Sequence, residues 1–273
     1  MGWYSGYLNK LYQEAEVLPL NACTKYVIMS DCHRGTGNQY DNFLKNQHLY
    51  FAAMQHYYQR GFTYLELGDG DELWENRCMN LISECHSDVY WLFSLLEKEK
   101  RIYQLAGNHD WQLRRERKHS IVLRPKEESG NDIFLIHGHQ VDFFNLVCWR
   151  MARFLVRYIW KPVEQMGVND PTSAARNYRK CRKTERRLKD WAQLNDVYLI
   201  SGHTHRPRLL EDQMNYMNCG SCVHPRCITA LEIEGMKITL VKWYMANRKD
   251  MSLYVARQTL VEPVTLFRNS DNT

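Results

Sequence analysis

Short apolar runs that end abruptly in polar residues recur five times along the chain. Each run is rich in β-branched and aromatic residues, and its hydrophobicity is continuous rather than alternating. Such runs are typical of strands buried on both faces in a layered α/β fold. The five runs are Tyr26–His33 (YVIMSDCH), Phe62–Glu72 (FTYLELGDGDE), Ile102–Asp110 (IYQLAGNHD), Ile133–His139 (IFLIHGH) and Val197–His205 (VYLISGHTH).

Helical periodicity separates several of these runs. Residues 40–61 carry apolar side chains at helical spacing, with Asp41 as the expected N-cap and Gly61 as the stop, and residues 87–100 predict a second helix. After residue 205, the shorter patterns NYMNCGS, CITALEIEG and MKITLVKWYM predict antiparallel strands that close a second sheet. The pattern therefore predicts an α/β fold with two sheets and flanking helices.

Residues 141–195 interrupt this alternation with two strongly basic helical patterns. The segment contains 12 Lys and Arg against 5 Asp and Glu, whereas the remainder of the chain carries 24 against 26. We interpret it as a helical, cap-like insertion near the active site of a single domain that spans residues 1–273. A basic stripe on its first helix is of the kind that attracts phosphorylated substrates, although a solvated face fits equally well; the stripe includes Arg150, Arg153 and Arg157.

The overall composition, 44% hydrophobic and 25% charged, is typical of a soluble globular protein. The N-terminal sequence lacks a basic start followed by an apolar stretch, so we expect no signal peptide, and no run is long enough to span a bilayer. Nine cysteines in a chain of this length favour a reducing cytoplasm over a disulfide framework. Cys219, Cys222 and Cys227 resemble a zinc knuckle without its second pair, which favours ordinary buried thiols.

Histidine, aspartate or asparagine residues stand at the end of every one of the five runs. Each of these endings alone is more typical of a turn, but buried strands bring their carboxyl ends to one crevice, so we expect the five to converge. Imidazole nitrogens mixed with carboxylate and amide oxygens suit Mn, Fe or Zn better than Mg or Ca. Two such ions, through a metal-activated hydroxide, favour the hydrolysis of phosphate esters.

The motifs DCH, GDGDE, GNHD, the histidine of HGH, and GHTH occur in the order and spacing of the calcineurin-like metallophosphoesterases, which the chain resembles from Tyr26 to Met245. The resemblance implies a two-sheet α/β sandwich with two divalent ions between the sheets. Manganese is the foremost candidate, with iron, zinc or nickel as alternatives. The resemblance implies that the first ion binds Asp31, His33, Asp69 and His205, and that the second shares Asp69 and adds Asn108, His137 and His203.

The resemblance also implies catalytic roles within GNHD. His109 matches the family's non-ligand histidine, which stabilises the transition state or protonates the leaving oxygen, and Asp110 is expected to orient it. Glu72 is expected to support the site, whereas Asp71 is expected to be an exposed loop carboxylate. Residues predicted to face the substrate are Arg34, His139, Arg150, Arg153 and Arg157.

The sequence indicates the type of reaction more closely than it indicates the substrate. GHTHRP, NCGS and the helical insertion resemble the branch that contains UDP-diacylglucosamine pyrophosphohydrolases, although that branch usually has Arg in place of His109. We expect hydrolysis of a phosphodiester or pyrophosphate bond in a small phosphorylated substrate, such as a nucleotide sugar or a lipid-linked molecule, with an acyl chain or nucleotide under the insertion. The alternatives are a nuclease acting on single-stranded nucleic acid and a non-catalytic scaffold of the same fold, as in the retromer coat.

Overall fold

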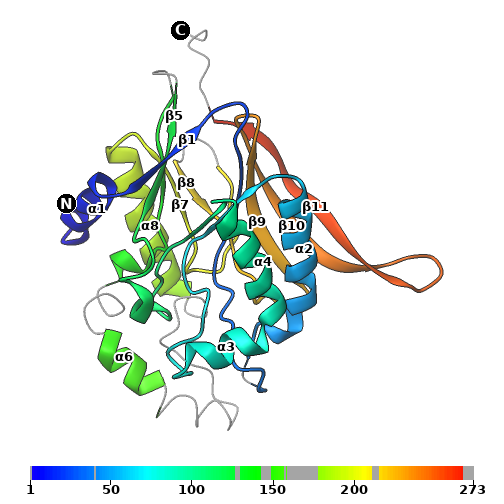
Figure 1. The fold of residues 1–273 in the computed structure, drawn as a ribbon. Helices are drawn as coiled ribbons and strands as arrows, with labels where there is room; N and C mark the ends of the chain where they lie inside the picture. Colours follow the sequence, from blue (N-terminus) through cyan, green and yellow to red (C-terminus); the bar gives the residue numbers. More distant parts are fainter. Residues whose placement is uncertain are drawn as a thin grey trace.

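Two mixed β-sheets pack face to face and carry helices on their outer faces (Figure 1). The computed structural model describes residues 2–39, 41–126, 130–142, 149–156, 158, 178–210 and 215–266. The five-stranded sheet has the order β1-β5-β6-β7-β8, with strands Glu16–Leu20, Ile121–Pro125, Ile133–Leu135, Tyr198–Ser201 and Tyr216–Asn218. The six-stranded sheet has the order β11-β10-β9-β2-β3-β4, with strands Leu253–Thr265, Lys237–Asn247, Cys227–Glu234, Lys25–Met29, Thr63–Glu66 and Ile102–Gln104.

This arrangement confirms the predicted two-sheet α/β sandwich. It also corrects the prediction of which strands belong to which sheet. The five apolar runs divide between the sheets, because β2, β3 and β4 pair in parallel in one sheet while β6 and β7 pair in parallel in the other. Of the three later patterns, β9 and β10 are antiparallel as expected, but they extend the sheet of β2. The prediction for β8 was wrong, since it pairs in parallel with β7.

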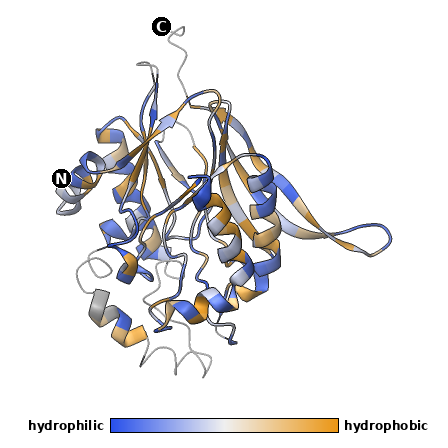
Figure 2. Ribbon diagram, viewed as in Figure 1, coloured by the Kyte–Doolittle hydropathy of each residue, from blue (hydrophilic) through white to orange (hydrophobic). Residues whose placement is uncertain are grey.

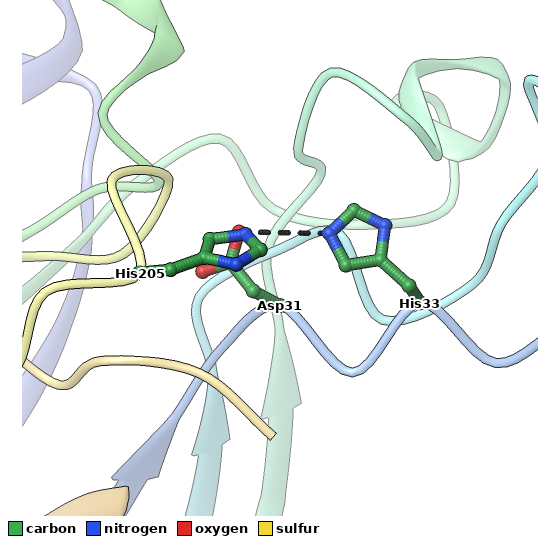
Figure 3. A group of neighbouring side chains, drawn as sticks. All are labelled: Asp31, His33 and His205. Carbon is green, nitrogen blue, oxygen red and sulfur yellow. Dashed lines mark ion pairs between the residues drawn. The ribbon is translucent and has the colours of Figure 1, made fainter. Parts of the chain in front are cut away.

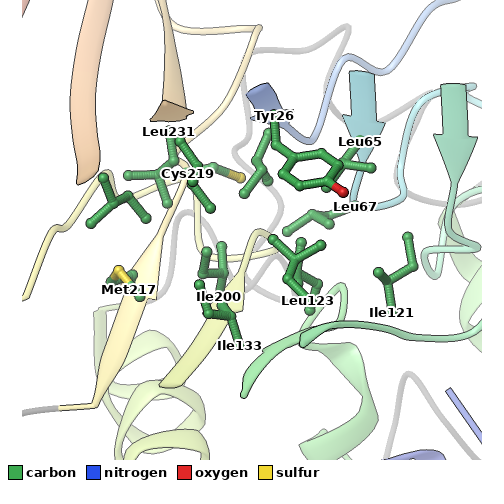
Figure 4. Close-up of a cluster of buried hydrophobic side chains, with 14 of the residues drawn as sticks. Tyr26, Leu65, Leu67, Ile121, Leu123, Ile133, Ile200, Met217, Cys219 and Leu231 are labelled. Carbon is green, nitrogen blue, oxygen red and sulfur yellow. The ribbon is translucent and has the colours of Figure 1, made fainter. Parts of the chain in front are cut away.

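The main core lies between the sheets and is built from side chains of both. Tyr26, Leu65 and Leu231 reach it from the six-stranded sheet, and Ile133 and Ile200 from the five-stranded sheet (Figure 4). Hydrophobic residues accordingly concentrate along the strands (Figure 2). Burial of this apolar area supplies the main driving force for joining the two sheets, and it fixes the positions of the strand ends that carry the polar motifs.

Within the described residues, two helices cover each outer face of the sandwich. Leu49, Met54, Leu92 and Phe93 of helices α2 (Gln47–Gln59) and α4 (Ser87–Lys98) pack on the six-stranded sheet. The five-stranded sheet packs against α1 (Tyr4–Gln13) and α8 (Tyr178–Leu194). Shorter helical segments lie in the connections: α3 (Met79–Cys85), α6 (Trp149–Leu155), η1 (Leu44–Asn46), η2 (Trp111–Leu113) and η3 (His139–Val141).

The helix predicted from Asp41 begins six residues later, at Gln47. Asp41 does not cap it, because its carboxylate accepts the backbone N–H groups of Gly37 (3.0 Å) and Phe43 (3.1 Å) and contacts Nε2 of His86 (3.0 Å). Asp41 therefore stabilises the loop before the helix instead of capping it. The 3₁₀ segment η1 forms the turn that precedes α2.

The second basic helix of the 141–195 segment is α8, and it belongs to the body of the fold. Leu188, Trp191 and Ala192 are buried against the five-stranded sheet, while the basic side chains of the helix lie mostly on its other face. The expected start of this helix near residue 170 lies outside the described residues. None of the described helices combines the length and apolar character that a membrane span requires.

Candidate metal centre

The polar residues at the five strand ends converge where the two sheets meet. Three groups of donor atoms form there, each with its ligand atoms within 4.8 Å of one another: Asp31, His33 and His205 in the first, Asp69, His137 and His203 in the second, and His33, Asp69 and His109 in a third that overlaps both. Five of the seven predicted ligands adopt left-handed backbone conformations with φ between 50° and 66°: Asp31, His33, Asp69, His203 and His205. Because this conformation costs about 1–3 kcal/mol for a residue with a side chain, the fold maintains local strain to aim these groups at one point.

Glycines in the motifs let the carboxylates come close to the opposite loops. A Cβ atom at Gly202 would lie 2.5 Å from Oδ2 of Asp31, and one at Gly107 would lie 2.2 Å from Oδ1 of Asp69. Any larger residue at either position would push the carboxylate out of place. The glycines of GHTH and GNHD are therefore required by packing at the site.

Asp31 is the centre of the first group (Figure 3). Its Oδ1 atom lies 3.1 Å from Nε2 of His205 and 3.9 Å from Nε2 of His33, while Oδ2 accepts the backbone N–H of His203 at 2.9 Å. Burial opposes ionisation of Asp31, but the neighbouring His205 outweighs it and holds the pKa of this carboxyl below its usual range. The group thus presents an ionised carboxylate oxygen between two imidazole nitrogens.

Asp69 lies between the first and second groups. Its Oδ2 atom is 3.2 Å from Nε2 of His137 in the second group and 4.0 Å from Nε2 of His33 in the first. Its Oδ1 atom accepts the backbone N–H of His109 at 2.7 Å, so the position of Oδ2 is fixed. Burial would raise the pKa of Asp69, yet His137 and His109 hold it well below the usual value. One ionised oxygen therefore faces both groups.

Hydrogen bonds also set the orientation of the second group. Nδ1 of His137 contacts the carbonyl oxygen of Leu67 at 2.8 Å, an arrangement in which Nδ1 donates and Nε2 is presented to the site. Oδ1 of Asn108 lies 3.1 Å from that Nε2 atom. Burial, together with the charge of His137, lowers the pKa of His203 to about 3, so its imidazole is neutral. Burial opposes the protonation of His137, but Asp69 outweighs it and raises the pKa of His137 to about 9, so this imidazole releases a proton when it binds a metal ion.

The arrangement fits divalent transition metal ions. Oδ1 of Asp31 is buried with an ion-pair contact to His205, whereas Nε2 of His203 is buried and forms no hydrogen bond with any described residue. A buried polar atom left in this state costs about 1–3 kcal/mol, and a bound cation removes that cost. Imidazole nitrogens combined with carboxylate and amide oxygens, without thiolates, match Mn, Fe, Zn or similar ions.

His109 is held by Glu72, and this corrects the predicted role of Asp110. Nδ1 of His109 lies 2.8 Å from Oε2 of Glu72, whose carboxylate also contacts Nδ1 of His33 at 2.8 Å. The ring of His109 stacks on that of Trp74 with a centroid separation of 4.3 Å. Burial opposes the protonation of His109, but Glu72 and Asp69 outweigh it and raise the pKa of His109 to about 10. The imidazole is therefore a positioned, charged hydrogen-bond donor.

Asp110 faces the backbone and a buried arginine instead. Its two oxygens accept the N–H groups of Gly107 (2.6 Å) and Gly70 (2.9 Å), and it forms an ion pair with Arg117. Arg117 also pairs with Asp71, which is completely buried rather than exposed as predicted. Asp110 therefore supports the two loops that carry the ligands, and it does not touch the imidazole of His109.

Arg34 continues this buried network and is enclosed by it. Its guanidinium makes a two-point ion pair with Glu66 (2.8 and 3.0 Å) and contacts Asp71 at 2.9 Å, and the residue is 0% exposed. The predicted contact between Arg34 and substrate is therefore not possible in this structure, because the guanidinium is fully buried and engaged by Glu66 and Asp71. No feature of the local sequence indicated this burial, since the two carboxylates come from β3 and the loop after it, and the rings of Tyr90 and Phe93 that the guanidinium contacts come from α4.

The remaining predicted substrate residues are only partly placed. His139 is 1% exposed, and its ring centroid lies 5.4 Å from that of His137, so it packs behind the ligands rather than at the opening. Arg153 lies in α6 and is half-buried. The side chain of Arg150 and the whole of Arg157 lie outside the described residues. Cys219 and Cys222 are buried, and within the described chain neither joins Cys227 in a cluster of metal-binding donors.

The sequence was also compared with known proteins. The sequence model of the calcineurin-like phosphoesterase family matches residues 24–207. No curated protein matches the chain. Among solved structures, Vps29 of Chaetomium thermophilum is 13% identical, with a TM-score of 0.43, and the match covers 90% of this chain and 99% of that one. A complex of the same organism's Vps29 with the RaPID-derived cyclic peptide RT-D3 gives 13% identity and a TM-score of 0.38, covering 89% of this chain and 97% of that one.

Proposed function

Because the chain belongs to the calcineurin-like phosphoesterase family, we propose that it is a dinuclear, metal-dependent hydrolase of phosphodiester or pyrophosphate bonds. The single observation that carries the proposal is the position of Oδ2 of Asp69, at 3.2 Å from His137 and 4.0 Å from His33. A carboxylate oxygen that faces two sets of histidine donors is the element that two ions can share.

The ligands are assigned as the family motifs imply. Asp31, His33, Asp69 and His205 hold one ion, and Asp69, Asn108, His137 and His203 hold the other. When bound, the two ions supply Lewis acidity, which lowers the pKa of a water molecule and neutralises charge on the phosphoryl oxygens. Manganese is our first choice, with iron, zinc and nickel as the other candidates.

His109 supplies the acid–base chemistry of this chain. Its Nδ1 atom is engaged by Glu72, which leaves the N–H at Nε2 for the substrate. The side chain is 23% exposed, against 0% for His137, so it can reach a bound phosphate ester. We assign to Nε2 a hydrogen bond to a phosphoryl oxygen and proton donation to the leaving oxygen. Trp74 limits the ring to one orientation by stacking on it.

Turnover of an aryl phosphodiester tests the proposal. The full-length protein is depleted with a chelator, reloaded with Mn²⁺, and supplied with bis(4-nitrophenyl) phosphate. We expect release of nitrophenol that depends on the added metal and is lost on Asp31→Asn, with unchanged turnover in the matched surface variant Asp250→Asn. Equal turnover in chelated and reloaded protein would contradict the proposal.

A metal-dependent nuclease is the second candidate. The solvent face of α8 carries Arg179, Lys183 and Arg186, all exposed, and a basic helix face is suited to a nucleic-acid backbone. A single-stranded oligonucleotide, assayed beside small nucleotide sugars under the same metal loading, separates the two candidates. Faster cleavage of the oligonucleotide would favour the nuclease.

A further inference from the structure

Helix α8 is fixed directly beside the candidate metal centre. Oγ1 of Thr204, in the GHTH motif, donates to the carboxylate of Glu185 at 3.1 Å. On the other side of the helix, Nζ of Lys180 pairs with Asp142 at 2.9 Å, just after the HGH motif. The first turns of α8 are therefore held between two of the loops that carry predicted ligands.

Three side chains gather at this end of α8. The guanidinium carbon of Arg206 lies 4.7 Å from the ring centroid of Tyr178, and that of Arg182 lies 5.6 Å from the same centroid. Tyr178 is 55% exposed. Arg206 follows His205 directly in the chain, so its side chain starts one residue away from a predicted metal ligand. We call Tyr178, Arg182 and Arg206 the arginine–tyrosine cluster.

The two guanidinium groups have no counter-ion within the part of the chain that the structure describes. No ion pair of the described carboxylates involves Arg182 or Arg206. Arg208, two residues after Arg206, does have one, because it lies 3.9 Å from Glu185. Two like charges gathered on one aromatic ring repel each other, and an anion placed between them removes that repulsion. The planar guanidinium fork matches two oxygens of a phosphate group.

We propose that the arginine–tyrosine cluster binds a second phosphate group of the substrate, one that is not hydrolysed. Tyr178 holds the two guanidinium groups in place by cation–π contact, and Arg182 and Arg206 donate to the phosphate oxygens. The inference rests on the proposed function and sharpens it. Of the two bond types proposed above, it favours pyrophosphates and other substrates with two neighbouring phosphates over simple diesters.

Binding of a non-hydrolysable probe tests the cluster independently of turnover. Titration calorimetry on the full-length protein as purified compares methylenediphosphonate, which has two phosphonate groups, with methylphosphonate, which has one. We expect Arg182→Gln and Arg206→Gln each to raise the Kd for methylenediphosphonate by about tenfold or more, the loss of one charge-assisted contact, and to leave the Kd for methylphosphonate unchanged.

The matched control is Arg248→Gln. Arg248 lies 5.3 Å from the ring centroid of Tyr254 in the β10–β11 hairpin, so the control removes the same charge and the same kind of contact away from the site. We expect it to bind both probes as the wild type does. The proposal is overturned if the wild type binds the two probes equally, or if either cluster variant keeps the wild-type Kd for methylenediphosphonate.

Kinetics separate failure of the cluster from failure of the proposed function. We expect both cluster variants to keep the wild-type KM for bis(4-nitrophenyl) phosphate and to raise the KM for UDP-glucose, which has two phosphates. If the wild type hydrolyses neither substrate, the proposed function fails, and the binding titration still decides the role of the cluster. If the wild type turns over both and the variants leave both KM values unchanged, only the cluster proposal fails.

Discussion

The carboxylate of Glu72 holds Nδ1 of His109 at 2.8 Å, whereas Asp110, the neighbour of His109 in sequence, contacts backbone N–H groups and Arg117. Glu72 also reaches Nδ1 of His33 at 2.8 Å, so one side chain orients both the candidate acid and a predicted metal ligand. The two carboxylates therefore have different tasks, which substitutions can separate.

Replacing His109 by alanine is expected to lower kcat for an aryl phosphodiester by about 10²–10⁴, the usual contribution of a positioned acid–base group. The metal content should stay unchanged, because His109 is assigned no ligand role: Glu72 holds its Nδ1 atom, and its ring contacts those of Trp74 and His33. Metal analysis of the purified variant checks this. Loss of metal in His109→Ala would instead identify the histidine as a ligand.

Glu72→Gln and Asp110→Asn are expected to differ in what they damage. Glu72→Gln should weaken metal affinity by about 10–100-fold and lower kcat, because it loosens His33 and His109 together. Asp110→Asn should mainly lower the free energy of unfolding, by about 3–5 kcal/mol, because it leaves the buried Arg117 with one carboxylate fewer. Metal titration and urea denaturation of both variants measure the contrast, and identical profiles would contradict it.

Arg34→Met is expected to destabilise the fold rather than to raise KM. The substitution leaves Glu66 buried without its cation and Asp71 with Arg117 alone, at a cost of about 3–5 kcal/mol. Arg124→Met is the control, because Arg124 pairs with Asp132 at the surface with 51% of its side chain exposed, where such a pair contributes less than about 1 kcal/mol. Urea denaturation compares the two. If Arg34→Met were as stable as the wild type but had a raised KM, the result would identify Arg34 as a substrate-binding residue.

The contact between Asp41 and His86 predicts a pH-dependent stability. Burial alone would raise the pKa of Asp41, but the hydrogen bonds from His86 and Gly37 outweigh it and lower the pKa. A carboxyl whose pKa is lower in the folded than in the unfolded state stabilises the protein above its unfolded pKa of about 3.9, and this contribution is lost as the pH falls through the folded pKa. The difference in unfolding free energy between the wild type and Asp41→Asn should therefore shrink as the pH falls from about 5 to 3. A constant difference would contradict the assignment.

The convergence of the motif residues could be predicted from sequence, because an apolar run that ends in His, Asp or Asn combines a buried strand with a polar carboxyl end. Which sheet each strand joins could not be predicted, because a short run such as that of β8 contains no information on the neighbour with which it pairs. The hydrogen-bond partner of His109 could not be predicted from sequence either. Adjacency made Asp110 the natural choice, but the direction of each side chain depends on the β3 loop that brings Glu72 across. The burial of Arg34 likewise depends on carboxylates more than 30 positions away.

Metal stoichiometry of the wild type and of Asp69→Asn tests the central claim most directly. Elemental analysis after reconstitution should find about two transition metal ions per wild-type chain, since two donor groups face Oδ2 of Asp69. Asp69→Asn should bind at most about one ion and should lose hydrolysis of bis(4-nitrophenyl) phosphate. A variant that keeps both ions and full turnover, or a wild type that binds no metal, would contradict a dinuclear phosphoesterase.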